Sequence, residues 1–329
     1  MRDHKTLILD KKQVAGLADM KAAIKAVEDV FREYGLGRTK MPPKIYLHLP
    51  EHGGDFRAMP AYVRRPDECV LKWVNVHPDN RRFGLPSVMA VIILSDPRNG
   101  LPLCIMAGGN PTNIRTGAAG GVAAKYLARK DSRVVGMVGC GAQARTQLLA
   151  LLNLFKLKDV KVWGFEPHEV KDFIRDMKKA KVKFTAAKDI EECVRGSDIV
   201  VTTTPSRKPL VKFAWLKAGA HINAIGADAK GKQELEHWIL RNAKVVVDSW
   251  EQASHSGEIN VPVSYGQITR NNIYADIGQI VSGRRKGRTN AKEITVFDST
   301  GLAIQDAAIA DLIFKTAVRK RVGIWVSLA

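Results

Sequence analysis

The chain has 329 residues, enough for about two domains of ordinary size. Hydrophobic residues make up 45% and charged residues 26%, which excludes general disorder, collagen-like repeats and low-complexity sequence. Lysine and arginine number 52 against 33 aspartate and glutamate residues, and the resulting formal net charge of +19 favours anionic partners.

These basic residues are spread along the chain. The densest clusters, at 284–288 and 319–321, lack interleaved aromatic residues, so we expect a solvated basic surface and no nucleic-acid partner. The longest apolar run, 88–94, is far shorter than the ~18 residues of a membrane span. The N-terminus also lacks the apolar core of a signal peptide, so we expect a cytoplasmic protein without membrane association. Neither the histidines nor the four cysteines show metal-ligand spacing.

The first part of the chain predicts one helix and then short strands. Apolar residues from Leu17 to Phe31 are spaced three and four apart and form one face of a helix, which Gly35 ends. The β-rich segments 44–49, 72–76 and 87–94 are separated by turn sequences. No long helical pattern lies between them, so we expect antiparallel or mixed pairing.

From residue 116 onward, strands alternate with helices. A helix rich in small residues is predicted at 116–127, and another helix at about 302–319 follows a strand near the C-terminus. The alternation indicates right-handed βαβ units and a doubly wound parallel sheet, the α/β architecture of Rossmann domains. The strands are predicted at 134–139, 160–165, 198–204, 221–226, 244–248 and 293–298, and the helices between them at 142–155, 167–180, 188–196 and 231–241.

A glycine motif joins the first strand of this run to its helix. It reads Gly139-x-Gly141-x-x-Ala144. The first glycine permits a tight turn, the second lets a pyrophosphate approach the backbone, and the small third residue lets helix and strand pack closely. Free N–H groups at the helix N-terminus favour the phosphate charge. The motif opens a run of alternating strands, so it predicts a dinucleotide site.

The choice between NAD and NADP depends on the end of the second strand of the run. Glu166 follows it and is suited to the ribose hydroxyls, which favours NAD. Alternatively, Glu166 is only a charge at a helix N-terminus. Gly164 could then leave room for a 2′-phosphate, with Lys161, His168 or Lys171 nearby. We expect NAD, with NADP as the alternative.

Polar residues follow two later strands of the predicted sheet. Thr203 and Thr204 end one strand, and Asp228 follows the next. Ligand contacts are expected at the carboxyl ends of parallel strands. Asp228 could act there as an acid or base, or it could cap the helix predicted after it.

Seven segments resemble the ornithine cyclodeaminase/mu-crystallin family, and most closely its archaeal-type alanine dehydrogenase branch. The resemblance runs in order from about residue 40 to 310. The segments read GDFRAMPAY (54–62), LKWVNVHPDN (71–80), GLPSVMAVIILSDPRNGLPL (84–103), IRTGAAGGVAAKYLA (114–128), VGCGAQARTQL (138–148), IGADAKGKQEL (225–235) and FDSTGLAIQD (297–306).

The resemblance implies two domains and a homodimer. Residues 1–114 and 302–329 would form a substrate-binding and dimerisation domain, and residues 115–301 the Rossmann domain. Members of the family bind NAD(H) or NADP(H). They transfer hydride at a carbon that bears an amine or imine beside a carboxylate.

The family's functional residues map onto five positions of this sequence. Lys72 matches its catalytic lysine and Asp228 its catalytic aspartate. Arg115 matches its substrate-carboxylate arginine, and Lys44 and Arg57 are further basic residues at the substrate. We expect Lys72 to polarise the substrate carbonyl and donate a proton to its oxygen. We expect Asp228 to take protons from ammonia and to handle water.

The matching segments also predict the cofactor contacts. Two positions depart from the family, because Ala107 and Gly164 stand where acids are usual. These departures affect the substrate details and the choice of cofactor. The predicted cofactor-binding residues are Thr116, Gly139, Gly141, Ala142, Gln143, Glu166, Thr203, Thr204 and Ser299.

The expected function is oxidative deamination of L-alanine to pyruvate and ammonium, with a small amino acid or 2-oxo acid as partner. Ornithine cyclodeaminase and a cyclic ketimine reductase, such as pyrroline-2-carboxylate reductase, are the alternatives within the family. A cofactor-binding or nucleic-acid-binding protein without turnover is an alternative of another class. Lys72, Arg115 and Asp228 argue against that last reading.

Overall fold

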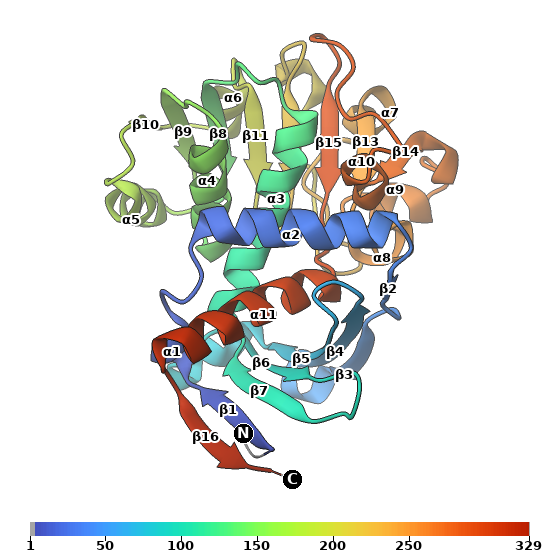
Figure 1. Cartoon of the computed structure of the whole chain (residues 1–329). Coiled ribbons are helices and arrows are strands. Elements are labelled where there is room, and N and C mark those ends of the chain that lie inside the picture. Colours follow the sequence, from blue (N-terminus) through green and yellow to red (C-terminus); the bar gives the residue numbers. More distant parts are fainter. Residues whose placement is uncertain (1–3, 329) are drawn as a thin grey trace. The chain divides into compact units, whose positions relative to one another are not determined.

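The computed structural model describes residues 4–328, which divide into two units (Figure 1). Unit 1 contains residues 4–115 and 302–328, and unit 2 contains residues 116–301. Arg115, expected at the start of the Rossmann domain, is the last residue of the first segment of unit 1.

Unit 1 is built on an eight-stranded sheet of order β16-β1-β7-β6-β5-β4-β2, with β3 paired to β4. The pairs from β3 to β7 are antiparallel, which confirms the antiparallel or mixed pairing expected for this part of the chain, and the pair β1–β7 is parallel. The strands are β1 (Lys5–Leu9), β2 (Thr39–Lys40), β3 (Ile45–Leu49), β4 (Gly54–Val63), β5 (Glu68–Val76), β6 (Val88–Ser95), β7 (Pro102–Ala107) and β16 (Ile324–Ser327).

Two helices cover one face of this sheet. α11 (Ala303–Lys320) packs on β4, β5 and β6, and α2 (Met20–Gly35) packs on α11. The side chain of Asp19 accepts a hydrogen bond from the backbone N–H of Ala22 and caps α2, and the predicted apolar face of α2 is buried. Shorter helical segments are α1 (Lys11–Val14), η1 (Pro50–His52) and η2 (Pro78–Phe83).

Side-chain alternation gives the two faces of this sheet different properties. Lys72 pairs with Met59 and Ile92, and all three are buried on the face toward α11. The next residue, Trp73, pairs with Val91 on the opposite face, where both side chains are exposed. The sheet therefore buries Lys72 on one face and exposes apolar side chains on the other.

Unit 2 is built on an eight-stranded sheet of order β10-β9-β8-β11-β12-β15-β13-β14, and all its pairs are parallel. The predicted doubly wound α/β fold is confirmed, and buried apolar clusters lie on both faces. The strands are β8 (Val134–Val138), β9 (Asp159–Trp163), β10 (Lys183–Ala186), β11 (Ile199–Thr202), β12 (His221–Ala224), β13 (Lys244–Val247), β14 (Ile273–Asp276) and β15 (Thr295–Asp298).

The helices predicted at 142–155, 167–180 and 188–196 form, and the one predicted at 116–127 begins already at Gly109. The helices at 250–256, 260–264 and 277–281 were not predicted. Helix 231–241 is predicted, but only α7 (His237–Asn242) forms. The residues before it run as a loop in which Leu235 forms a bridge with Val211. The other helical segments are α3 (Gly109–Leu127), α4 (Ala142–Leu154), α5 (Pro167–Met177), α6 (Ile190–Val194), η3 (Phe213–Trp215), α8 (Trp250–Ser256), α9 (Asn260–Ser264), η4 (Arg270–Asn272) and α10 (Ile277–Val281).

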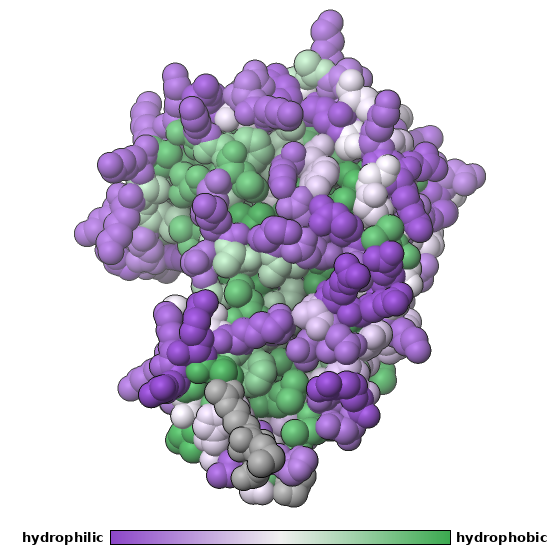
Figure 2. Space-filling model, viewed as in Figure 1, coloured by the Kyte–Doolittle hydropathy of each residue, from purple (hydrophilic) through white to green (hydrophobic). Residues whose placement is uncertain are grey.

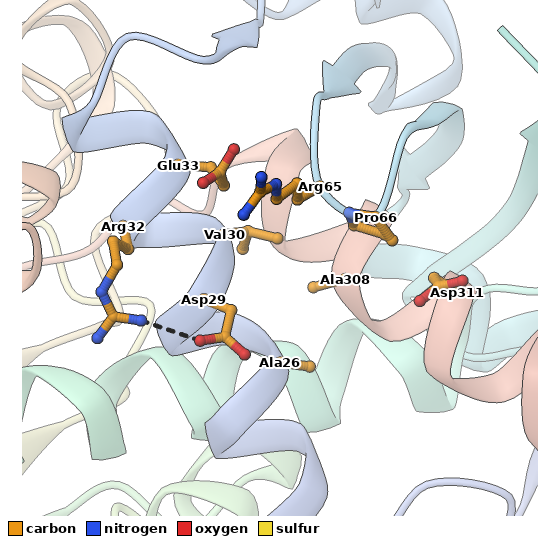
Figure 3. A pocket seen from close by; sticks show the side chains of 9 residues that line it. All are labelled: Ala26, Asp29, Val30, Arg32, Glu33, Arg65, Pro66, Ala308 and Asp311. Atoms are coloured by element: carbon orange, nitrogen blue, oxygen red, sulfur yellow. Dashed lines mark hydrogen bonds and ion pairs between the residues drawn. The ribbon is translucent and has the colours of Figure 1, made fainter.

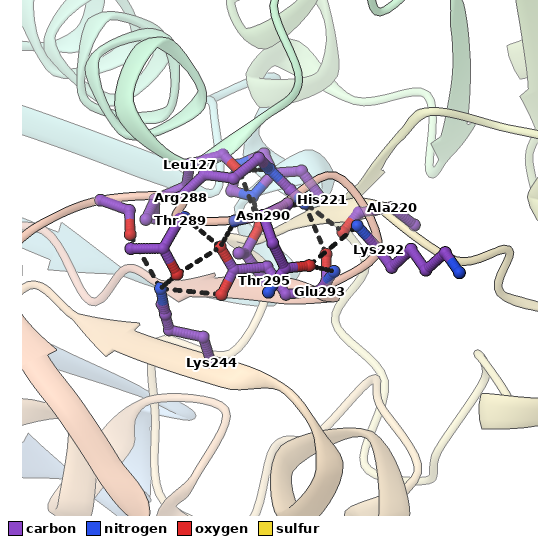
Figure 4. Close-up of polar contacts among 11 residues, drawn as sticks. Leu127, Ala220, His221, Lys244, Arg288, Thr289, Asn290, Lys292, Glu293 and Thr295 are labelled. Atoms are coloured by element: carbon purple, nitrogen blue, oxygen red, sulfur yellow. Dashed lines mark hydrogen bonds and ion pairs between the residues drawn. The ribbon is translucent and has the colours of Figure 1, made fainter.

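Arg288, which belongs to the basic cluster 284–288, forms hydrogen bonds within unit 2. At the amino ends of β12 and β15, the Arg288 guanidinium donates to the backbone oxygens of Leu127, Ala220 and Glu293 (Figure 4). Lys244 lies 2.7 Å from the Glu293 carboxylate in the same network. These contacts satisfy carbonyl groups at the edge of the sheet opposite to the expected ligand edge.

Hydrophilic side chains are distributed over both units on the face shown in Figure 2. Within residues 4–328, no helix combines the length and the apolar character needed to cross a membrane.

Candidate active site

A buried ion pair lies between β5 and α11. Nζ of Lys72 is 2.9 Å and 2.7 Å from the two carboxylate oxygens of Asp306, and these side chains are 1% and 0% exposed. Burial lowers the pKa of Lys72 to about 7, with a contribution from the nearby Arg115 cation, while Asp306 acts in the opposite direction. Lys72 can therefore gain or lose a proton near neutral pH.

Arg115 approaches the same carboxylate from α3. Its Nε atom lies 3.3 Å from Oδ1 of Asp306, and its Nη1 atom donates to Oε1 of Gln305 at 2.9 Å. Nε of Arg115 and Nε2 of Gln305 are buried without a hydrogen-bond acceptor among the described residues. Buried donors without acceptors are costly, and a ligand carboxylate would satisfy them.

The other two predicted substrate residues belong to the same unit. Arg57 lies on β4 on the same face as Lys72, is bonded to Asp55 at 2.7 Å and 3.2 Å, and stacks over the ring of Tyr46. The charge of Lys44 helps to lower the pKa of Lys72, which places it near that lysine. Unit 1 thus supplies four cationic residues but only two of the carboxylates described here, Asp306 and Asp55. This excess of positive charge favours an anionic substrate.

Asp306 and Gln305 were missed by the sequence reasoning. Both belong to the segment FDSTGLAIQD, which carried the family resemblance without a role for its last two residues. The available signal was an amide and an acid side by side at the start of a mostly apolar helix. Residues of that kind are rarely buried without a partner.

The glycine motif of unit 2 has the geometry expected for a pyrophosphate. Gly139 has φ +110°, and a Cβ there would lie 2.6 Å from Oγ1 of Thr203. Gly141 begins α4 without a side-chain cap, and open space lies where its side chain would be. Ala142 and Gln143 are the first residues of α4, so their N–H groups belong to the free helix N-terminus.

Two predicted cofactor residues carry buried hydroxyl groups without a partner in the described chain. These are Oγ1 of Thr203, beside the glycine turn, and Oγ of Ser299, after β15. Both lie at the carboxyl ends of strands, so they fit a dinucleotide. Thr204 differs, because its N–H and its hydroxyl both donate to Glu234. Thr116 is buried, and its carbonyl accepts from Gln147.

Glu166 and its neighbours are the residues on which the predicted choice between NAD and NADP depends. Glu166 is exposed and precedes α5 without capping it by its side chain. A Cβ at Gly164 would lie 2.7 Å from Sγ of Cys140, so the space beside this glycine is taken by the cysteine. Lys161, named above as a partner for a 2′-phosphate, donates to the backbone carbonyls of Glu192 and Arg195.

Asp228 lies in the loop after β12. Its carboxylate is partly exposed and pairs with Nζ of Lys232 at 2.6 Å. The reading of Asp228 as a helix cap is wrong, because the next residues form a turn and a loop. Lys232 was not singled out from the sequence, although a spacing of four residues is typical of such pairs in helices.

A separate cavity of about 440 Å³ lies in unit 1 beside α2 and α11 (Figure 3). Asp29, Arg32, Glu33, Arg65 and Asp311 supply charges of both signs to its lining. None of the predicted site residues lines this cavity, and Arg32 already pairs with Asp29 at 3.0 Å. It is distinct from the buried Lys72 group.

The sequence as a whole decides the family. The model of the ornithine cyclodeaminase/mu-crystallin family matches residues 4–321. The chain belongs to the ornithine cyclodeaminase/mu-crystallin family. The chain is 50% identical to an alanine dehydrogenase of Archaeoglobus fulgidus over 318 residues, or 97% of each protein.

Two solved structures are similar to the present chain over nearly their whole length. An archaeal alanine dehydrogenase dimer with bound NAD has a TM-score of 0.95 and 49% identity, covering 99% of this chain and 100% of that one. The Delta(1)-pyrroline-2-carboxylate reductase of Thermococcus litoralis, in complex with NADH and L-proline, has a TM-score of 0.94 and 38% identity, covering 98% and 100%.

Proposed function

We propose that this protein is an NAD-dependent alanine dehydrogenase. It converts L-alanine, NAD⁺ and water to pyruvate, ammonium, NADH and a proton, and the reaction is reversible. The observation that carries the proposal is the buried cluster of Lys72, Asp306 and Arg115, in a chain that is 50% identical in sequence to an alanine dehydrogenase. Unit 1 serves as the substrate domain and unit 2 as the dinucleotide domain.

Arg115 binds the substrate carboxylate in this proposal. Its buried Nε atom has the ion-pair contact with Asp306 at 3.3 Å but no hydrogen bond, and Nε2 of Gln305 also lacks an acceptor among the described residues. A carboxylate supplies acceptors for both, and a guanidinium can hold it by two parallel bonds. Arg57 and Lys44 add positive charge. Fixing the acid in this way removes much of the entropic barrier to reaction at the adjacent carbon.

Lys72 supplies the proton for the oxygen on that carbon. In reductive amination it polarises the carbonyl of pyruvate and protonates the oxygen that leaves as water. A pKa of about 7 suits a group that must both give and recover a proton near neutral pH. Asp228 takes the protons that ammonia loses as it adds to the carbonyl, and Lys232 holds its carboxylate.

When bound, NAD would supply the hydride acceptor for the oxidation of L-alanine, and NADH the hydride donor for the reverse direction. Gly139, Gly141, Ala142 and Gln143 would hold its pyrophosphate at the N-terminus of α4. Thr116, Glu166, Thr203, Thr204 and Ser299 are the remaining proposed contacts. Glu166 is proposed to favour NAD over NADP, because an acid repels the 2′-phosphate of NADP.

Reduction of a cyclic imine is the second candidate. It is favoured by the 38% identity to the reductase whose structure holds NADH and L-proline. The same arginine and lysine would act on the cyclic imino acid, since it also carries a carboxylate beside the reacting carbon. Ornithine cyclodeaminase remains the other alternative in this family.

We also propose that the protein is a homodimer joined through the outer face of the unit 1 sheet. Ile45, Trp73 and Val91 are 64%, 42% and 44% exposed. They lie in one row across β3, β4, β5 and β6, with Ala58 between Ile45 and Trp73. An apolar row of this kind is suited to a second copy of the chain, and the similar archaeal alanine dehydrogenase is a dimer.

The deciding experiment follows the oxidation of NADH and of NADPH by purified protein with pyruvate, with and without ammonium. Ammonium-dependent oxidation of NADH is the expected result. Two further assays are run in parallel. One follows NADH and NADPH oxidation with pyrroline-2-carboxylate, and the other measures the formation of proline from ornithine in the presence of NAD. Turnover of either of these, without activity on pyruvate, would replace the proposal with the corresponding alternative.

A further inference from the structure

Glu234 lies at the carboxyl edge of the unit 2 sheet and is fully buried. Its carboxylate accepts four hydrogen bonds. Oε1 accepts from the N–H of Thr204 at 2.6 Å and from its hydroxyl at 2.7 Å. Oε2 accepts from the hydroxyl of Thr202 at 2.7 Å and from the N–H of Gly226 at 2.9 Å. One side chain therefore joins the loops that follow β11 and β12.

These two loops carry residues assigned above to catalysis and cofactor binding. The first contains Thr203, whose buried hydroxyl has no partner in the described chain and lies beside Gly139. The second contains Asp228, two residues after Gly226. The loops are packed tightly, because a Cβ at Gly226 would lie 2.3 Å from the carbonyl oxygen of Thr204 and 2.5 Å from Oε2 of Glu234.

Further buried carboxylates hold Glu234 in place. Glu258 accepts from the backbone N–H groups of Glu234 and Leu235, and Asp298 accepts from that of Glu258. Burial and the nearby Glu234 charge raise the pKa of Glu258 well above its ordinary value. Burial also raises the pKa of Asp298 to about 8. Burial raises the pKa of Glu234 as well, but its four donated hydrogen bonds act in the opposite direction, so we assign the negative charge to Glu234 and a proton to Glu258.

We propose that Glu234 is a positioning residue: its buried carboxylate sets the Thr203 and Asp228 loops in the arrangement that binds the nicotinamide cofactor and supports turnover. Glu234 touches neither substrate nor cofactor in this proposal and acts through the loops. The inference rests on the proposed function, because it takes the roles of Thr203 and Asp228 from it.

Glu234→Gln is the decisive variant, because it keeps the shape of the side chain and changes its donors. The amide oxygen can still accept from one side. The amide NH₂ then faces either the N–H of Thr204 or the N–H of Gly226, and that backbone group loses its acceptor. Glu236→Gln is the matched control. Glu236 lies on the same loop and accepts from the backbone N–H of Phe213 at 2.8 Å, and Phe213 is nine residues along the chain from Thr204.

The experiment measures NADH affinity by fluorescence titration, the kinetics of reductive amination, and the melting temperature of each protein. For Glu234→Gln we expect a Kd for NADH raised about tenfold and a kcat lowered about 10- to 100-fold, as for a misplaced catalytic group. The KM for pyruvate should change less than threefold, since its carboxylate is assigned to unit 1. For Glu236→Gln, the Kd for NADH, the kcat and the KM for pyruvate should all stay within twofold of the wild-type values.

A folded Glu234→Gln protein with wild-type NADH affinity and kcat, or with losses equal to those of Glu236→Gln, overturns the proposal. If Glu234→Gln does not fold, Thr202→Val decides, because it removes one of the four donors without changing shape. We then expect a three- to tenfold loss of kcat, and wild-type kcat and NADH affinity would overturn the proposal. Wild-type protein that binds NADH but is inactive with pyruvate contradicts the proposed function instead, and the NADH titration still decides the role of Glu234.

Discussion

At the scale of single residues, the buried lysine is the group on which the proposed chemistry depends most. Lys72→Ala removes the proton donor but leaves the glycine turn and α4 of unit 2 unchanged. We expect kcat to fall about 10²- to 10⁴-fold, the usual contribution of general acid catalysis. The Kd for NADH, measured by fluorescence titration, should stay at the wild-type value. Turnover close to wild type would remove Lys72 from the mechanism.

The partner of this lysine gives a second, independent prediction. The Asp306 carboxylate raises the pKa of Lys72 against the effect of burial, so Asp306→Asn should move that pKa below about 7. Reductive amination needs the protonated lysine, so its rate is high below the pKa and falls above it. The midpoint of that fall in kcat/KM for pyruvate should therefore move to lower pH.

The control for this pH profile is Asp311→Asn. Asp311 lies on the same helix but pairs with Lys315. Profiles of variant and wild type are compared at equal ammonium, so the titration of ammonia itself cancels. A midpoint that does not move in Asp306→Asn, or that moves equally in Asp311→Asn, would contradict the role of Asp306.

The sequence predicted the types of residue in this site better than their pairing. Lys72 and Arg115 could be assigned because each belongs to a short recognisable segment. Asp306 is 234 positions from Lys72, and only the packing of α11 on β5 brings them together. Glu234 was missed for a related reason, since its segment has a helical pattern and hydrogen bonds to two distant loops hold it out of a helix.

At the scale of elements, the alternation in the sequence predicted six of the eight strands of unit 2 and the helices α4, α5 and α6, with ends displaced by a few residues. The sequence analysis missed β1, β2, β4, β7, β10, β14 and β16. Of these strands, β2, β10, β14 and β16 lie at the edges of their sheets, whereas β4 and β7 lie inside the unit 1 sheet. Edge strands are buried less than central ones, so their hydrophobic pattern is weaker. β10 shows this directly, because none of its four residues is buried.

The contact between β5 and α11 also predicts how stability depends on pH. Glu68 begins β5, and burial together with the nearby Asp311 raises its pKa to about 7. The folded protein then holds this proton more tightly than the unfolded chain does. The stabilisation is complete below the ordinary carboxyl pKa of about 4.5 and is lost as pH rises through 7.

Glu68→Gln should therefore raise the melting temperature by a few degrees at pH 8 and change it less at pH 5. The measurement is thermal unfolding by circular dichroism at both pH values. Glu51→Gln, an exposed position on η1, is the control and should show no such difference. An equal effect of Glu68→Gln at the two pH values would contradict a raised pKa.

At the scale of the whole molecule, the net charge of +19 opposes association of two copies. The proposed dimer must therefore be held by the apolar row on the outer face of the unit 1 sheet. Val91→Glu places a charge in that row without changing the face toward Lys72. We expect a wild-type dimer and a Val91→Glu monomer by size-exclusion chromatography with light scattering.

The salt dependence of the same measurement separates the two forces. Salt screens the repulsion between the copies, with a Debye length of about 10 Å at 0.1 M, but leaves apolar burial in place. The wild-type dimer should therefore tighten as salt is raised from low concentration. Leu149→Glu is the control, since Leu149 is an exposed leucine of α4 in unit 2, 41% accessible, and should leave the mass unchanged. A Val91→Glu protein with the mass of wild type would exclude this face as the dimer contact, because a carboxylate in a dry apolar interface without a partner is strongly disfavoured.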